Sequence, residues 1–374
     1  LLAIPFFILA GNIMKRGGIA IRLINLAKLV TGRIPGALAH TNAVANMLFG
    51  AISGSGTAAA SAMGSIIGPI EAEEGYDAEF SAAANIATAP TGLLIPPSNV
   101  MITFSLVSGG TSVAALFMAG YIPGILWGLA CMIVIYIFAK KKGYKSTSSF
   151  KGKEKLMVIW QALPSLLMIV IVIGGIIGGI FTATEGSVVA VVYTLILSLF
   201  FYKTIKFKDL PEIFLASAEM TGIIVFLIGV SSIMSWVMAF TDIPTLVSNA
   251  LLGISNNKYV IFFIINIILL IVGTFMDMTP ATLIFTPIFL PICQQLGMNV
   301  IHFGIMMIFN LCIGTITPPV GTTLFVGVKV GGTTIEKVIK PLLWYFAAIF
   351  AVLMLVTYVP QISLWLPGVM GYVK

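Results

Sequence analysis

The chain consists of long apolar runs separated by short polar loops, and this pattern limits the folds open to it. A helix needs roughly 20 residues, at about 1.5 Å each, to cross ~30 Å of hydrocarbon. Only 20 basic and 13 acidic residues occur among 374, whereas about a quarter of the residues of a soluble protein are charged. We therefore predict an all-α polytopic membrane protein. The runs that we interpret as crossings lie at 1–14, 79–108, 119–139, 156–178, 182–202, 219–240, 300–330 and 341–358.

Two further apolar stretches, 37–72 and 257–296, are interrupted near their midpoints by Gly, Ser, Thr, Asp or Pro. This pattern is typical of re-entrant helical hairpins, which enter and leave a membrane on the same side. The stretches 17–34 and 242–255 are too polar or too short to cross, and we expect them to lie as helices on opposite membrane surfaces.

The basic residues support this layout. With both hairpins re-entrant and Lys15 and Arg16 in the cytoplasm, every Lys and Arg except Lys258 and Lys374 falls on the cytoplasmic side, including the lysine-rich loop 140–155. The net charge of +7 is thereby explained as a topology signal, and nucleic-acid binding is disfavoured. The acidic residues at 71–79 are expected to form a solvated cytoplasmic turn.

An internal repeat relates the two halves of the chain. Residues 222 positions apart are identical mainly where Gly and Pro interrupt helices, and such residues fix the shape of the backbone. The predicted topology places the two copies on opposite membrane faces, so we interpret them as inverted repeats, each with one hairpin and one broken helix. The second copy has two extra spans, which predicts one or two further spans before Leu1. Matches include Thr57/Thr279, Pro69/Pro291, Gly92/Gly314, Pro96/Pro318, Pro97/Pro319 and Gly110/Gly332.

The four interruptions are the candidate sites. A helix break at membrane depth leaves polar backbone groups that protein, water or a ligand must satisfy. Proline removes an N–H donor four residues after Gly92 and after Gly314, which predicts exposed carbonyls there. Carbonyl and hydroxyl oxygens suit a hard cation such as Na⁺. The half-helices that follow the breaks begin near Ser98, Asn99, Thr322 and Thr323, where positive helix ends would attract an anionic substrate.

Asp277 is the acidic residue near the middle of the second interrupted stretch, and we predict that it contacts the cation or the substrate. The alternative is that it only caps the following helix.

A serine hydrolase using Ser53 or Ser55 with His40 or His302 is disfavoured, because no G-x-S-x-G elbow surrounds these serines. A simpler interpretation is that these glycines and prolines only kink transmembrane helices. Four breaks that pair at the same offset of 222 residues argue against it.

The sequence resembles a known family. The segments LLAIPFFILAGNIM, FGAISGSGTAAASAMG, APTGLLIPPSNVMI, DMTPATLIFTPIFLP and IGTITPPVGTTLF are similar to those of the large membrane subunit of tripartite ATP-independent periplasmic (TRAP) transporters. The resemblance implies Na⁺-driven uptake of a small organic acid, such as a dicarboxylate or sialic acid, across the bacterial inner membrane. It also implies a soluble periplasmic substrate-binding protein that delivers the substrate, and a small four-helix membrane subunit, separate or fused, as partners of a chain embedded in membrane lipid.

The resemblance further implies an elevator-type fold, in which a transport domain slides against a scaffold. The scaffold would comprise 1–36 and 140–255. The transport domain would comprise 37–139, with a hairpin at 37–75 and a broken helix at 79–110, and 256–374, with a hairpin at 257–297 and a broken helix at 300–332.

Carried over by motif, two Na⁺ sites are implied. One would join Ser53, Ser55 and Gly56 to Gly92, Ile95 and Pro96, and the other would join Asp277 and Thr279 to Gly314, Thr317 and Gly321. The alternatives are a proton-coupled or channel-like carrier of the same fold that uses Asp277, and a scaffolding membrane protein without transport, which would not need four matched breaks.

Overall fold

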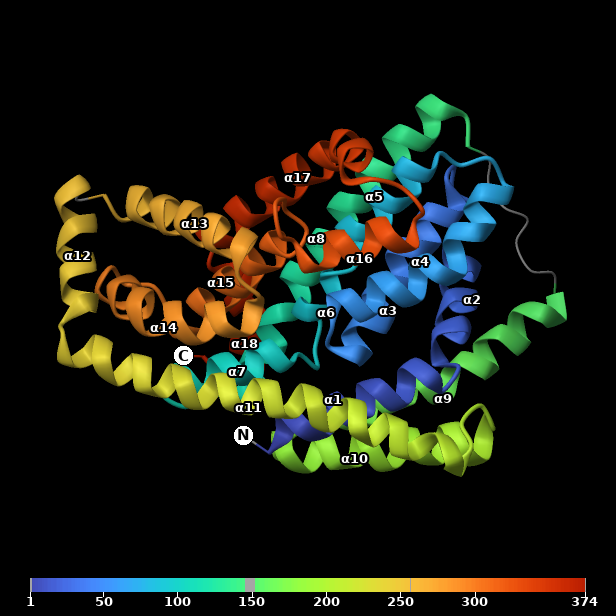
Figure 1. Cartoon of the computed structure of the whole chain (residues 1–374), viewed down its shortest axis with the longest axis horizontal. Helices are drawn as coiled ribbons and strands as arrows, with labels where there is room; N and C mark the ends of the chain where they lie inside the picture. The colour runs from blue at the N-terminus through green and yellow to red at the C-terminus, as the bar shows by residue number, and fades with distance from the viewer. Residues whose placement is uncertain (1, 145–151, 256, 374) are drawn as a thin grey trace.

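The computed structural model describes residues 2–144, 152–255 and 257–373, and every regular element within them is a helix (Figure 1). Most of the lysine-rich loop predicted at 140–155, and Lys374, lie outside the described residues. In the first part the helices are α1 (Ala3–Arg16), α2 (Ile19–Thr31), α3 (Ala37–Ser53), α4 (Gly56–Glu73), α5 (Ala78–Thr88), α6 (Thr91–Leu94), α7 (Asn99–Val107) and α8 (Val113–Lys142).

The second part begins with two helices that pack on α1 and α2, and it ends with a broken helix and two further helices. It comprises α9 (Gly152–Ile177), α10 (Ala183–Ile196) with a π-helical turn at Leu197–Phe201, a 3-10 turn at Phe207–Asp209, α11 (Leu210–Phe240), α12 (Ile243–Ile254), α13 (Lys258–Phe275), α14 (Met278–Gln295), α15 (Val300–Gly314), α16 (Thr322–Val330), α17 (Ile335–Tyr358) and α18 (Gln361–Val369).

Six of the described helices are long and apolar enough to cross a membrane, or up to eight if each bent pair counts as one span. The prediction of an all-helical chain with several such helices is confirmed. Three spans, predicted at 119–139, 219–240 and 341–358, begin earlier in the structure: α8 begins at Val113, α11 at Leu210 and α17 at Ile335. Helix α18 was not predicted.

Each predicted hairpin is a pair of helices joined by a short turn. The pair α3–α4 and the pair α13–α14 enter the molecule from opposite sides, and their turns face its centre (Figure 1). Each predicted broken helix is also interrupted: the chain bends by 48° between 78–94 and 99–107, and it is not helical between Gly314 and Thr322 apart from turns. The re-entrance of the hairpins and the division into domains stay predictions.

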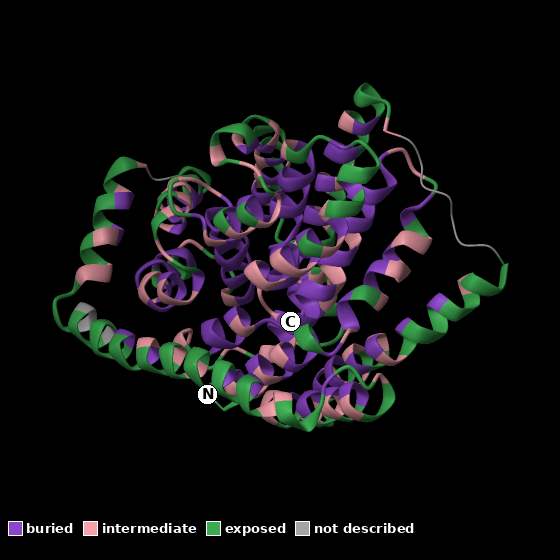
Figure 2. Ribbon diagram, turned by 45° about the vertical axis from the view of Figure 1, so that its right-hand side comes forward, coloured by how far each residue is buried: buried purple, intermediate pink, exposed green. Residues whose placement is uncertain are grey.

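The core lies where the two copies meet. The Trp127 ring on α8 packs 4.7 Å from the Phe309 ring on α15, and the indole N–H donates to the carbonyl oxygen of Ala87 at 2.8 Å. Phe104 on α7 and Phe303 on α15 pair across the same boundary at 6.1 Å. By contrast, α11 and α12 are largely exposed (Figure 2), as expected of apolar surface that faces lipid or a partner.

The prediction that the whole acidic segment 71–79 is solvated is wrong for Glu71. Its exposed fraction is 0%, whereas Glu73, Glu74 and Asp77 are exposed. The cause is helical periodicity: α4 continues to Glu73, and Glu71 extends the buried stripe of Met63, Gly64 and Ile67.

Candidate functional site

The turn of the first hairpin gathers a cluster of hydroxyls. Helix α3 ends at Ser53, and Gly54 reverses the chain with a φ of 61°, a left-handed conformation that glycine adopts at little cost. Ser55 is then the N-cap of α4: its Oγ accepts a hydrogen bond from the Ala58 N–H at 3.2 Å and lies 3.0 Å from Thr57 Oγ1. The tip therefore places hydroxyl oxygens at the N-terminal end of a helix.

The turn of the second hairpin places a carboxylate at the equivalent position. Asp277 is the N-cap of α14, as Ser55 is of α4, but its side chain makes no capping hydrogen bond. Asp277 thus occupies the cap position without the side-chain hydrogen bond that the alternative of a simple helix cap would lead us to expect. Because the side chain is exposed, its carboxylate remains available to a cation or a ligand.

The first break lies against the first hairpin. The one-turn helix α6 is followed by Ile95 in an extended conformation and by the pair Pro96 and Pro97. Gly92 touches the α3 backbone so closely that a Cβ there would lie 2.1 Å from the Cα of Gly50. Beyond the break, Ser98 is the N-cap of α7, and its buried Oγ has no hydrogen-bond partner among the described residues.

The second break is closed by backbone hydrogen bonds. The carbonyl oxygen of Thr315 accepts from the N–H groups of Thr323 at 2.9 Å and Leu324 at 3.2 Å, which ties α15 to α16. The Gly314 carbonyl accepts from the Thr317 N–H at 3.0 Å, so the expectation that it would be left without a partner is wrong: the chain makes a tight turn there.

Carbonyl oxygens nevertheless converge inside this break. A Cβ at Gly321 would lie 2.8 Å from the Thr317 carbonyl oxygen and 3.0 Å from that of Thr315. The Thr317 hydroxyl donates to the Ile313 carbonyl at 2.7 Å, which leaves its oxygen lone pairs free to accept. Glycine is thus the residue that leaves room beside these oxygens.

The tips and breaks surround one cavity of about 540 Å³. It brings together eight of the sequence-predicted site residues: Ser53, Ser55, Gly56, Asn99, Asp277, Thr279, Thr322 and Thr323. Seven others do not line it, namely Gly92, Ile95, Pro96, Ser98, Gly314, Thr317 and Gly321; they lie within or beside the two breaks. The first residues of four helices, α4, α7, α14 and α16, are in the lining.

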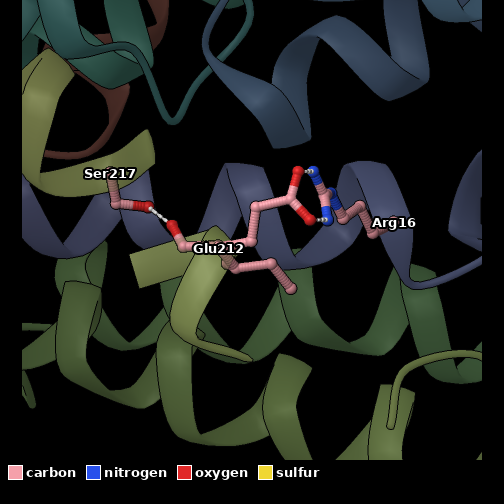
Figure 3. A network of polar contacts seen from close by, with 4 residues as sticks. Arg16, Glu212 and Ser217 are labelled. Atoms are coloured by element: carbon pink, nitrogen blue, oxygen red, sulfur yellow. Dashed lines mark hydrogen bonds and ion pairs between the residues drawn. The ribbon is translucent and has the colours of Figure 1, made fainter. Parts of the chain in front are cut away.

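The opposite wall of the cavity was not predicted. It is formed by α1, through Ile8, Gly11, Asn12 and Lys15, and by apolar residues of α11. Two polar contacts fasten these helices together. Arg16 makes a two-pronged ion pair with Glu212, with Nη1 2.7 Å from Oε2 (Figure 3). Asn12 Nδ2 also donates to Ser217 Oγ at 2.9 Å. Asn12, a polar residue inside an apolar run, was the available signal for this wall.

The two copies repeat two local features. Gly92 crosses Gly50 in the first copy, and Gly314 crosses Gly273 in the second, where a Cβ on Gly314 would lie 2.4 Å from the Gly273 backbone. Each copy also holds a buried asparagine pair between its hairpin and its broken helix: Asn46 Nδ2 donates to Asn85 Oδ1 at 3.0 Å, and Asn310 Nδ2 donates to Asn266 Oδ1 at 2.8 Å. These contacts hold each break against its hairpin.

Comparison with known proteins identifies the family. Residues 1–362 match the family described as the tripartite ATP-independent periplasmic transporter, DctM component. The chain belongs to this family. It is 56% identical to the protein YgiK of Salmonella typhimurium over 98% of this chain and 84% of that protein.

Two further relatives carry functional names. The DctM-family chain is 39% identical to the C4-dicarboxylate TRAP transporter large permease protein DctM of Pseudomonas aeruginosa, over 99% of this chain and 87% of that protein. It is 35% identical to the sialic acid TRAP transporter large permease protein SiaM of Vibrio cholerae, over 100% of this chain and 87% of that protein.

Family membership settles the class of protein. The chain is a TRAP transporter permease of the inner membrane, and the family is one of transporters, not of enzymes. The geometry agrees: neither His40 nor His302 lines the cavity that contains Ser53 and Ser55. Among the described residues no three His, Cys, Asp or Glu side chains are grouped so that they could hold a metal ion, so a cation in this cavity would depend mainly on hydroxyl and carbonyl oxygens.

Proposed function

We propose that this DctM-family protein is the large membrane subunit of a Na⁺-coupled importer that takes up a small organic acid by an elevator mechanism. The observation that carries the proposal is the convergence of four helix N-termini, at Gly56, Asn99, Met278 and Thr322, on one cavity. Each N-terminus carries the positive end of a helix dipole, so together they favour a bound anion.

The chemistry of the cavity indicates an organic acid. The lining combines these helix ends with the side-chain amide of Asn99, the hydroxyls of Thr322 and Thr323, and the ammonium of Lys15. A carboxylate would accept hydrogen bonds from the helix ends, while its hydroxyl or second carboxylate would contact the threonines. The similarity to C4-dicarboxylate and sialic acid permeases supports the same substrate class.

The residues at the breaks fit Na⁺. In the second break, the carbonyl oxygens of Thr315 and Thr317 converge beside Gly321, and Asp277 and Thr279 lie in the cavity wall. In the first, the hydroxyls of Ser53 and Ser55 lie at the hairpin turn, beside Asn99. Such neutral oxygens with few charges suit a monovalent cation, and a cation beside the substrate would offset the negative charge of the acid.

The elevator proposal rests on the two-sided construction of the cavity. One side comes from the hairpin turns and breaks, which we assign to a transport domain of 37–139 and 256–374. The other comes from α1 and α11, which we assign to a scaffold of 1–36 and 140–255. Movement of one side along the other would carry a substrate held by the tips across the membrane. The family's tripartite description supports a small membrane subunit and a periplasmic binding protein as partners.

Uptake by reconstituted vesicles tests the proposal. The complex, with its small subunit, is placed in proteoliposomes, and uptake of a labelled C4-dicarboxylate or sialic acid is measured with and without a periplasmic binding protein. We expect uptake that requires both an inward Na⁺ gradient and the binding protein. Equal uptake driven by a pH gradient without Na⁺ would contradict Na⁺ coupling and favour a proton-coupled or channel-like carrier that uses Asp277.

A further inference from the structure

A second, smaller cavity lies at the far end of the first hairpin. Its volume is about 220 Å³, and it is enclosed by α3, by the end of α4 and the turn that follows, by α5 and by the C-terminal end of α16. Polar lining residues are Asn42, Glu71, Tyr76, Ser81 and Asn85. It shares no lining residue with the cavity at the hairpin turns.

Glu71 is the acidic group of this cavity. Its side chain is fully buried, and neither carboxyl oxygen makes a hydrogen bond of normal geometry among the described residues. The nearby Asn42 Nδ2 is likewise buried without a partner, and the Ser81 hydroxyl lies close enough to act on the Glu71 carboxyl as a hydrogen-bond donor. No Lys or Arg lines the cavity. An unpaired carboxylate in such surroundings costs several kcal/mol or more, so the group must either bind a cation or take up a proton.

The orientation of Asn42 distinguishes these two possibilities. Asn42 Oδ1 accepts a hydrogen bond from Asn46 Nδ2 at 2.8 Å, so the free part of the Asn42 amide is its N–H donors. Donors of this kind repel a metal ion, whereas they can hydrogen-bond the carboxyl in either protonation state; with no cation beside the buried group, desolvation favours its protonated form. We propose that Glu71 is a proton-binding site, and that its proton stabilises the packing of the first hairpin against α5 and the end of α16.

Glu71 lies in the last turn of α4, outside the helices long enough to cross a membrane. Burial raises the pKa of this carboxyl from 4.5 to about 8, although the Ser81 hydroxyl opposes the rise. The Glu71 carboxyl in turn acts electrostatically on two tyrosines, Tyr76 in the following turn and Tyr345 on α17. Other titratable groups on the packed elements do not line the cavity: His40 on α3, Glu73 and Glu74 at the end of α4, Asp77 and Glu79 at the start of α5, and Lys329 on α16.

The sign of the pH effect follows from this shift. Between pH values of about 4.5 and about 8 the folded protein holds a proton that the unfolded chain has lost. The stabilisation by Glu71 is therefore fully present below about 4.5 and is lost as the pH rises to about 8. Above that range the carboxyl is charged in both states, and its contribution no longer changes.

Thermal unfolding of the purified permease complex in detergent tests the proposal. Gln resembles a protonated Glu, so the Glu71→Gln variant should unfold at nearly the wild-type temperature near pH 5. It should become more stable than wild type by several degrees as the pH approaches 8. The exposed neighbour Glu73→Gln is the matched control and should follow the wild-type profile. In infrared spectra at neutral pH, Glu71→Gln should also remove one band of a protonated carboxyl.

Two results would overturn the proposal. One is a wild-type profile parallel to that of Glu71→Gln throughout this pH range, with no carboxyl band lost. The other is stabilisation of the wild type by Na⁺ at pH 8 that Glu71→Gln abolishes, because the site would then bind a metal ion. Neither readout requires transport, so the outcome is independent of the proposed function.

Discussion

Asp277 is the acidic residue among those that line the main cavity, and Lys15 is the basic one. Asp277 begins α14 without capping it. Its carboxylate is therefore the negatively charged group of the lining that could bind a cation. The rest of the polar lining consists of hydroxyls, amides and helix ends. The equivalent residue in the first copy, Ser55, does cap its helix, so the two copies differ in charge at this position.

Asp277→Asn should weaken the response to Na⁺. The substitution keeps the size of the side chain but removes a full negative charge near the proposed cation. We expect the Na⁺ concentration for half-maximal uptake to rise about tenfold or more, which corresponds to about 1.4 kcal/mol. Initial uptake rates measured across a series of Na⁺ concentrations in proteoliposomes check this value.

Asp242→Asn is the matched control. Asp242 is exposed, lies between α11 and α12, and has a φ of 58°, a conformation that Asn also tolerates. It is outside the cavity and should leave Na⁺ activation unchanged. If Asp277→Asn behaved like this control, Asp277 would have no part in coupling.

At this scale the sequence predicts residues whose role follows from their type and local position. The hydroxyls and the carboxylate of the hairpin turns lie in the cavity as expected of polar residues in apolar stretches. Lys15 and Glu71 were missed for a different reason. Lys15 lies at the end of α1, and its place in the cavity depends on contacts between α1 and the distant hairpins; Glu71 is buried because α4 continues past the point where polarity suggests a solvated turn.

At the scale of elements, the breaks depend on close backbone crossings. Gly92 lies against Gly50, and Gly314 lies against Gly273, in each case with backbone atoms where a Cβ would have to be. Backbone atoms within packed helices cannot move aside as a flexible side chain can. The glycines therefore let each broken helix approach its own hairpin.

Gly92→Ala and Gly314→Ala should both be destabilising. The added methyl group would lie 2.1 Å and 2.4 Å, respectively, from the backbone of the facing glycine, so the helices must separate. We expect each to lower the free energy of unfolding by at least about 1–3 kcal/mol, the usual cost of overpacking. Unfolding temperatures of the purified variants, together with the yield of monodisperse protein, provide the measurement.

The control for these variants is Gly229→Ala in α11, where nothing lies within 4 Å of the new Cβ. A glycine-to-alanine change in a helix interior without a clash should be neutral or stabilising by about 0.5–1 kcal/mol. If all three variants unfolded at the same temperature, the close backbone crossings would not be the reason for glycine at positions 92 and 314.

The existence of these elements is predictable because Gly and Pro interrupt helices through their own covalent structure. Their ends are less predictable. The predicted span at 219–240 starts nine residues after α11 does, because polarity marks Glu212 and Lys208 as loop. In the structure Glu212 remains helical and pairs with Arg16 of α1, a contact between segments far apart in the sequence.

At the scale of the molecule, the cavity lies between the hairpin turns and breaks on one side and α1 and α11 on the other. The first hairpin turn lies close to this wall at Gly11 of α1: a Cβ there would lie 3.0 Å from the carbonyl oxygen of Ser53 and 3.5 Å from its Cα. The repeat pattern predicts that hairpins and breaks gather, but periodicity holds no information on which helix faces them. The proposed sliding movement requires the first hairpin turn to pass along α1 at this point.

Gly11→Val therefore tests the elevator movement. The branched side chain should act as a wedge between α1 and the first hairpin turn, so we expect uptake to fall about tenfold or more. The proposed Na⁺ ligands all belong to the hairpins and breaks, so stabilisation of the purified variant by Na⁺ should persist. Gly174→Val in α9 introduces the same side chain where nothing lies within 4 Å, and it should transport normally. If Gly11→Val matched Gly174→Val, the turn would not slide past α1; if the Na⁺ effect disappeared together with uptake, Gly11 would shape the ion site instead of the path of movement.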